Sequence, residues 1–148
     1  MIDPNSTHTE SIEALYFAYR AFTAEPDRVL AARGLGRAHH RIVHFVGRQP
    51  GITVGGLLDT LSISKQALAG PLRRLVQDGL VHSEPDADDK RIRKLSLTPT
   101  GAALAADLSA VQSAMLQRAF ALVGHDAAAA WLDTTLALAA QDTGAATP

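Results

Sequence analysis

The chain has 148 residues, a formal net charge of -1 and no cysteine. This length fits one ordinary domain, and the lack of cysteine excludes disulfides, thiolate metal sites and a cysteine nucleophile. The sequence shows neither the layout of a signal peptide nor an apolar run long enough to span a membrane. We therefore expect a single cytoplasmic domain that does not interact with a membrane.

The charges are distributed unevenly along the chain. Residues 33–94 carry 11 basic and 6 acidic side chains, whereas residues 1–32 and 95–148 each have a net charge of -3. The local field, rather than the net charge, attracts a polyanion. An acidic partner such as nucleic acid is therefore expected to bind the middle of the chain.

The first helices follow from apolar residues at three- and four-residue spacing. A helix is predicted at about 10–23 and should end at Glu25-Pro26, because the residue before a proline disfavours helix. A short piece, 27–32, leads to a glycine-rich break. A second full helix is predicted over 37–48.

Two short helices with a tight turn between them come next. Thr53 can cap a helix over 54–61, and Ser64 can cap a second one over 65–78. Pro71 lies inside that second helix and is expected to bend it, because proline removes one backbone hydrogen bond.

After Gly79, which suits the left-handed position at a helix end, the pattern becomes that of strands. Strands are predicted over 80–84 and 93–97, joined by a charged turn. Thr98-Pro99 then starts a long helix that reaches residue 123. Asp126 is predicted to cap a last helix that ends at about residue 141.

Helix, turn and basic second helix, followed by a charged ribbon, form the pattern of a winged helix-turn-helix. Such a second helix fits the major groove of DNA and presents its first turn to the base edges. Lys65, Gln66 and Arg73 suit this role, since glutamine can pair with adenine and arginine with guanine or phosphate. Arg91 at the ribbon tip suits the minor groove. The predicted fold class is mostly α with a small β-ribbon wing.

Five motifs strengthen this interpretation, and they are Gly51-Ile52-Thr53-Val54, Ser62-Ile63-Ser64-Lys65-Gln66-Ala67-Leu68, Leu75-Val76-Gln77-Asp78-Gly79-Leu80-Val81, Asp89-Lys90-Arg91 and Leu97-Thr98-Pro99-Thr100-Gly101. Together they resemble the multiple-antibiotic-resistance-regulator (MarR) family of bacterial transcription factors. The resemblance implies that Arg91 contacts the minor groove and that Asp89 supports it. Gly70 departs from the family, because many members have arginine there.

The resemblance also implies a homodimer. The dimerisation helices would be those at about 10–32 and 99–141, around a DNA-binding lobe at about 34–98, all within one domain over 1–148. The predicted dimer interface includes Leu15, Tyr16, Phe22, Leu108, Met115 and Trp131. The residues predicted to contact or position DNA are Ser64, Lys65, Gln66, Ala69, Gly70, Arg73, Arg74, Asp89, Lys90, Arg91 and Arg93.

His40 and His44 are one helical turn apart, a spacing that can hold a metal ion. A third ligand at fixed spacing is missing, so a hydrogen-bonded core position or the wall of a pocket is favoured over a metal site. The resemblance adds weight to an effector pocket lined by these histidines and Tyr19. No cofactor and no metal are predicted.

The sequence lacks a phosphate-binding glycine loop, a nucleophile elbow and a zinc-protease motif, so we expect no enzyme. The predicted protein is a homodimeric transcriptional regulator that binds a pseudo-palindromic operator in double-stranded DNA. We expect a repressor whose activity a small-molecule effector can modulate. The alternative is a winged-helix protein-interaction dimer without specific DNA binding, which Gly70 and Pro71 keep open.

Overall fold

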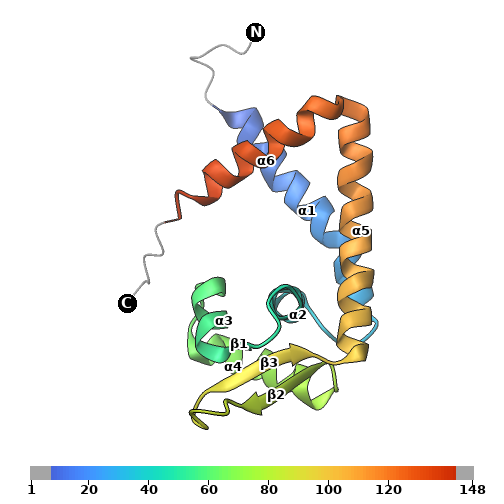
Figure 1. Cartoon of the computed structure of the whole chain (residues 1–148). Coiled ribbons are helices and arrows are strands. Elements are labelled where there is room, and N and C mark those ends of the chain that lie inside the picture. The colour runs from blue at the N-terminus through green and yellow to red at the C-terminus, as the bar shows by residue number, and fades with distance from the viewer. Residues whose placement is uncertain (1–7, 143–148) are drawn as a thin grey trace.

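Two groups of elements meet at one long helix in the computed structural model, which describes residues 8–142 (Figure 1). The upper group in Figure 1 contains α1 (Thr9–Ala31), α5 (Pro99–Val123) and α6 (His125–Ala139). The lower group contains α2 (Arg37–Arg48), α3 (Val54–Leu61), α4 (Lys65–Gln77) and a small sheet. Helix α5 rises from the sheet to the far end of the molecule, where α6 turns back. The mostly α fold class with a β-ribbon is confirmed.

The sheet has three antiparallel strands in the order β1-β3-β2. The predicted ribbon is formed by β2 (Val81–Pro85), which begins one residue later than expected, and β3 (Arg93–Leu97). The third strand, β1 (Ile52–Thr53), was not predicted. Two residues are too few to show an alternating pattern, and β1 exists only because it pairs with β3.

The predicted end of the first helix is wrong. Helix α1 continues through Pro26 to Ala31 instead of ending at Glu25-Pro26. Proline in a helix interior costs about 3 kcal/mol or more, because it removes a hydrogen bond and clashes with the preceding turn. Pro26 and Leu30 are both buried, so the packing of this last part of α1 offsets that cost.

Three predicted helix starts are confirmed by side-chain hydrogen bonds. Thr53 accepts from the backbone of Gly56 at 3.0 Å, and Ser64 accepts from Ala67 at 3.1 Å. The predicted cap at Asp126 is wrong, because α6 already begins at His125. Helix α4 is assigned as unbroken across Pro71.

The third confirmed start joins α5 to the lower group. The Thr98 hydroxyl accepts from the backbone of Gly101 at 3.1 Å and donates to the Gly79 carbonyl. The backbone of Thr98 donates to the Leu80 carbonyl at 3.1 Å. A Cβ on Gly101 would lie 1.9 Å from that same carbonyl oxygen, so only glycine allows this close crossing.

The buried core lies in the lower group and in the parts of α1 and α5 next to it. Its members are Leu30, Leu35, Ile42, Val43, Val46, Ile52, Leu57, Leu68, Leu75, Leu80, Val81, Leu95, Leu104 and Leu108. By contrast, every residue from 8 to 21 is exposed in the single chain, and α6 has no buried residue. Within residues 8–142, no helix is long and apolar enough to cross a membrane.

Candidate nucleic-acid interface

Helix α4 presents one polar face to solvent. Leu68 and Leu75 are buried, which turns Gln66, Gly70 and Arg73 outward. The Ser64 cap leaves the first turn of α4 open, with two exposed polar side chains and the positive end of the helix dipole. Helix face, cationic groups and dipole together suit an anionic partner.

The guanidinium of Arg74 forms its bonds within the chain. Its Nε atom lies 2.7 Å from Oδ2 of Asp78, and its Nη2 atom donates to the carbonyl of Arg33 at 3.2 Å. Arg33 follows α1, so this guanidinium ties the end of α4 to the end of α1. Sequence reasoning grouped Arg74 with the DNA contacts, because nothing local in the sequence shows this distant acceptor.

The wing is the β2–β3 ribbon with its turn, and it holds Arg91 at its tip. The Asp89 carboxylate accepts three hydrogen bonds from Arg91, one each from the backbone N–H, Nε and Nη2, all at 3.1 Å. The Arg91 side chain is nevertheless 91% exposed. The structure thus brings the predicted pair together and leaves the guanidinium accessible. Lys90 beside it is also exposed.

Asp86 organises the turn, and sequence reasoning missed this role. Its carboxylate accepts from the backbone N–H groups of Asp88 and Asp89, both at 3.1 Å, and lies 2.8 Å from Nζ of Lys94. The hydrogen bonds from Lys94 and from the backbone lower the pKa of Asp86. An aspartate that begins a polar turn often bonds the backbone two residues on, and that signal could have identified Asp86.

Arg93, the first residue of β3, braces the ribbon next to the turn. Its Nε donates to the Ser83 hydroxyl at 3.1 Å and its Nη2 to the Ser83 carbonyl at 2.9 Å, across the two strands. Arg91 in turn lowers the pKa of Asp89, chiefly through its side-chain hydrogen bonds. Because the pKa values of Asp86 and Asp89 are both lowered, both carboxylates are ionised at neutral pH and keep their cationic partners in place.

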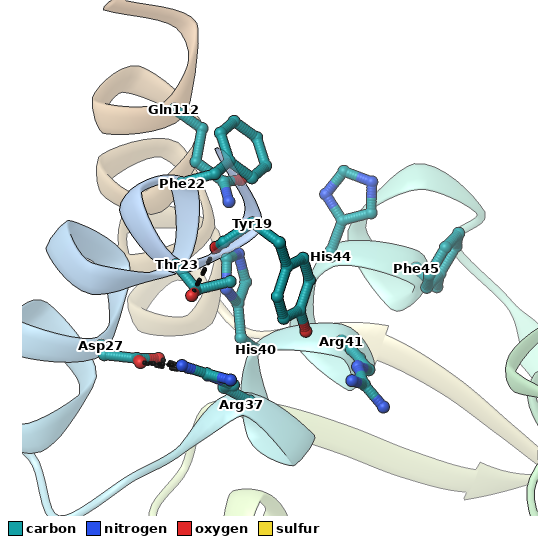
Figure 2. Close-up of a pocket in the computed structure, with 10 residues that line it drawn as sticks. All are labelled: Tyr19, Phe22, Thr23, Asp27, Arg37, His40, Arg41, His44, Phe45 and Gln112. Atoms are coloured by element: carbon teal, nitrogen blue, oxygen red, sulfur yellow. Dashed lines mark hydrogen bonds and ion pairs between the residues drawn. The ribbon is translucent and has the colours of Figure 1, made fainter. Parts of the chain in front are cut away.

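A second candidate site is an open cavity of about 340 Å³ between the two groups of elements. Figure 2 shows side chains from α1 and α2 around it, with Gln112 reaching in from α5. Its lining residues are Tyr19, Phe22, Thr23, Asp27, Arg37, His40, Arg41, His44, Phe45 and Gln112. The three residues predicted for an effector pocket are therefore all at this cavity.

The chemistry of the cavity is aromatic and cationic. Arg37 pairs with Asp27, with Nη2 and Oδ2 3.0 Å apart, and its guanidinium lies over the ring of Tyr19. Burial lowers the pKa values of His40 and His44 and thereby favours the neutral form of both imidazoles. In residues 8–142, no three His, Asp or Glu side chains gather into a group that could hold a metal ion.

The residues predicted for the dimer interface occupy different environments. Leu15, Tyr16 and Trp131 are exposed apolar side chains. Phe22 and Met115 are half-buried. Leu108 is 1% exposed and packs in the chain's own core, so it has no surface left for a partner.

Comparison with known proteins gives concordant results. A model described as the MarR family matches residues 33–92. The HTH-type transcriptional regulator PetP of Rhodobacter capsulatus is 48% identical over 120 residues, which cover 81% of this chain and 72% of that protein.

Solved structures share the fold. A crystal structure of MarR has a TM-score of 0.72 at 21% identity and covers 95% of this chain and 94% of its own. A structure of the transcriptional regulator SlyA has a TM-score of 0.75 at 16% identity, covering 88% and 92%. A mutant of S. aureus MepR bound to an oligodeoxyribonucleotide has a TM-score of 0.63 at 15% identity, covering 88% and 96%.

The role of Asp86 can be tested by amide hydrogen exchange. Asp86→Ala removes the acceptor of two backbone N–H groups, so the amides of residues 88 and 89 should exchange faster, about as fast as in an unstructured loop. Because the pKa of Asp86 is lowered, the wild type should keep this protection from neutral pH down to the ordinary aspartate range, at about pH 4. Protection should be lost only at lower pH, where the carboxylate becomes protonated. Asp88→Ala is the control, since it removes a carboxylate from the same turn and leaves the Asp86 bonds intact. Equal protection in both variants would contradict this role.

Proposed function

The chain belongs to the MarR family of transcriptional regulators and is not an enzyme, and from this premise we propose that it binds a pseudo-palindromic DNA operator as a homodimer. The single observation that carries the proposal is the guanidinium of Arg91, which two ionised carboxylate oxygens orient while it stays 91% exposed. A fixed, accessible guanidinium at a ribbon tip suits the narrow minor groove. Because a bacterial operator lies in the cytoplasm, the proposal includes a cytoplasmic location for the protein.

Each subunit would insert α4 into a major groove. Gln66 in the first turn can read adenine, and Lys65 and Arg73 can reach phosphate or guanine. Lys90 adds a phosphate contact near the wing tip. In this proposal Arg74 and Arg93 act by holding α4 and the wing in place, because their guanidinium groups are bonded within the chain.

The homodimer is supported by apolar surface that the single chain leaves uncovered. Exposed large apolar side chains on α1 are Ile12, Leu15, Tyr16, Phe17 and Tyr19, and those on α6 are Trp131, Leu132, Leu136 and Leu138. Surfaces of this kind mark contacts with other proteins. Two-fold symmetry covers both helices at once and sets the half-sites about one helical turn, roughly 10 bp, apart.

We further propose that the regulator is a repressor and that a small molecule in the cavity at Tyr19, His40 and His44 modulates it. Helix α2 lines the cavity and also packs against α3 and α4. A ligand between α1, α5 and α2 would therefore favour one placement of α4 over another. It changes DNA affinity only if it binds the two placements unequally.

The alternative is a winged-helix dimer that binds protein and has no specific DNA site. Gly70 favours it, because this position of the DNA-facing helix has no side chain to read a base. The measurements below separate the two.

Arg91→Ala tests the proposed DNA contact. The change should weaken binding to the operator by about 1–3 kcal/mol and leave the melting temperature nearly unchanged, because the side chain is exposed. Fluorescence anisotropy with duplex DNA from upstream of the chain's own gene, titrated against salt, measures both affinity and the number of phosphate contacts. Arg28→Ala is the control, since Arg28 pairs with Glu25 on α1, outside α4 and the wing. Undiminished binding by Arg91→Ala would favour the protein-binding alternative.

A double substitution on α6 tests the homodimer. Leu132→Glu with Leu136→Glu puts two charges on the exposed apolar surface, so light scattering should report a monomer, and operator affinity should fall by at least 100-fold with the second half-site lost. Ala137→Glu adds one charge to another exposed position of the same helix and should remain a dimer. A dimer that persists in the double variant would place the interface elsewhere.

Ligand binding tests the effector. The aromatic walls and the guanidinium groups of Arg37 and Arg41 make monocyclic aromatic carboxylates a suitable probe set. A ligand should raise the melting temperature and lower operator affinity in the wild type. In Arg41→Ala, each effect should need at least a tenfold higher ligand concentration. Arg28→Ala should respond as the wild type does. If saturating probe leaves both properties unchanged, the effector proposal is withdrawn for this class.

A further inference from the structure

Gly70 lies in the middle of α4, on its exposed face, where the fold does not require glycine. Its backbone is ordinary helix, since the glycines with positive φ are Gly34, Gly51, Gly79 and Gly124. Apart from Gly70 itself, its two chain neighbours and the nearby backbone of the helix, no heavy atom of residues 8–142 lies within 4 Å of the place where a Cβ would be. A small side chain there would meet no other element of the fold.

Glycine at such a position weakens the helix. It loses more backbone freedom on folding than any other residue, and it is the poorest helix former after proline. Two other helical glycines make close contacts within the fold. A Cβ on Gly101 would meet the Leu80 carbonyl, and a Cβ on Gly47 would lie 2.9 Å from Cδ1 of Leu97. Gly70 precedes Pro71, and a residue before proline disfavours helix partly through its Cβ, so glycine eases the helix into Pro71 and also leaves this exposed position open to a partner.

The surroundings of Gly70 indicate what approaches it. Gln66 lies one turn before it and Arg73 lies just under one turn after it, both exposed, while Ala67 and Ala69 beside it are small and exposed. The face therefore has long polar side chains at both ends and only small side chains, or none, between them. Backbone N–H groups in the middle of a helix are already used, so this middle part offers carbon contacts rather than hydrogen bonds.

We propose that Gly70 is a specificity-determining residue that admits the C5 methyl group of a thymine to the backbone of α4. This methyl is the apolar group that projects into the major groove, and apolar contact is how proteins read it. The inference rests on the proposed function, because it requires α4 to enter the major groove of DNA.

The contact predicts a compensation between protein and DNA. Adding a methyl group to the protein with Gly70→Ala should fill the space that the thymine methyl needs. Removing the methyl group from the DNA, by replacing that thymine with uracil, should make the space available again. Uracil keeps every hydrogen-bonding group of thymine, so the exchange changes only the methyl contact.

The experiment begins with selection of a binding site by the wild-type dimer from a randomised DNA duplex. Each thymine of the selected site is then replaced singly by uracil, and affinities of the wild type and Gly70→Ala are measured. At one position per half-site, uracil should weaken the wild type about fivefold. Gly70→Ala should bind the thymine site at least tenfold more weakly than the wild type and recover on the uracil site.

Two controls separate a contact from a change in folding. Gly70→Ala should fold as the wild type does and leave binding to random DNA unchanged, because the added Cβ meets no other element of the fold. Gly55→Ala adds a methyl group to another helical glycine, in α3, where Oγ1 of Thr53 lies 3.9 Å from the added Cβ. It should also fold as the wild type does and leave the site preference unchanged.

Three results would overturn the inference. Gly70→Ala could bind the thymine site as tightly as the wild type, lose affinity for random DNA equally, or respond to uracil just as the wild type does. In each case the wild type still selects a site, so the proposed DNA-binding function survives. If the wild type selects no site, the proposed function and this inference fail together.

Discussion

The close crossing of Thr98 and Gly101 over Leu80 is the constraint on which the arrangement of the molecule depends. The hydroxyl of Thr98 accepts from the backbone N–H of Gly101 and donates to the carbonyl of Gly79, while the missing side chain of Gly101 lets the backbones approach. The end of α4, the base of the wing and the start of the long helix are thereby fixed to one point. A change in the direction of α5 would therefore also move the end of α4 and the wing.

The two groups of elements differ in their charge and in how much of their apolar surface is buried within the chain. The lower group has most of the buried core and 11 of the 14 basic residues, and its exposed polar groups suit a polyanion. The upper group is acidic and lacks a core of its own along residues 8–21 and α6. This division explains how a chain with a net charge of -1 can offer a polyanion a basic region, since the two acidic segments are separated in sequence from residues 33–94.

What the sequence could and could not predict follows from the range of each interaction. Helix starts at Thr53, Ser64 and Thr98 depend on residues three positions away, so they were predictable. The continuation of α1 through Pro26 depends on burial against distant elements, and β1 depends on β3. At the candidate site, the resemblance to the MarR family indicated Asp89 and Arg91 as a pair, and they are only two residues apart. The internal role of Arg74 was not, because its carbonyl acceptor lies 41 residues away.

The turn built on Asp86 constrains how this region can evolve. One carboxylate fixes the distances to the amides of residues 88 and 89 and to Lys94, and the strand register fixes Pro85 opposite Arg93. Point changes at exposed positions such as Lys90 preserve that geometry. An insertion or deletion inside the turn would break all of these bonds at once. Related sequences should therefore differ here by substitution and keep the length of the turn, whereas the chain ends are free of this constraint.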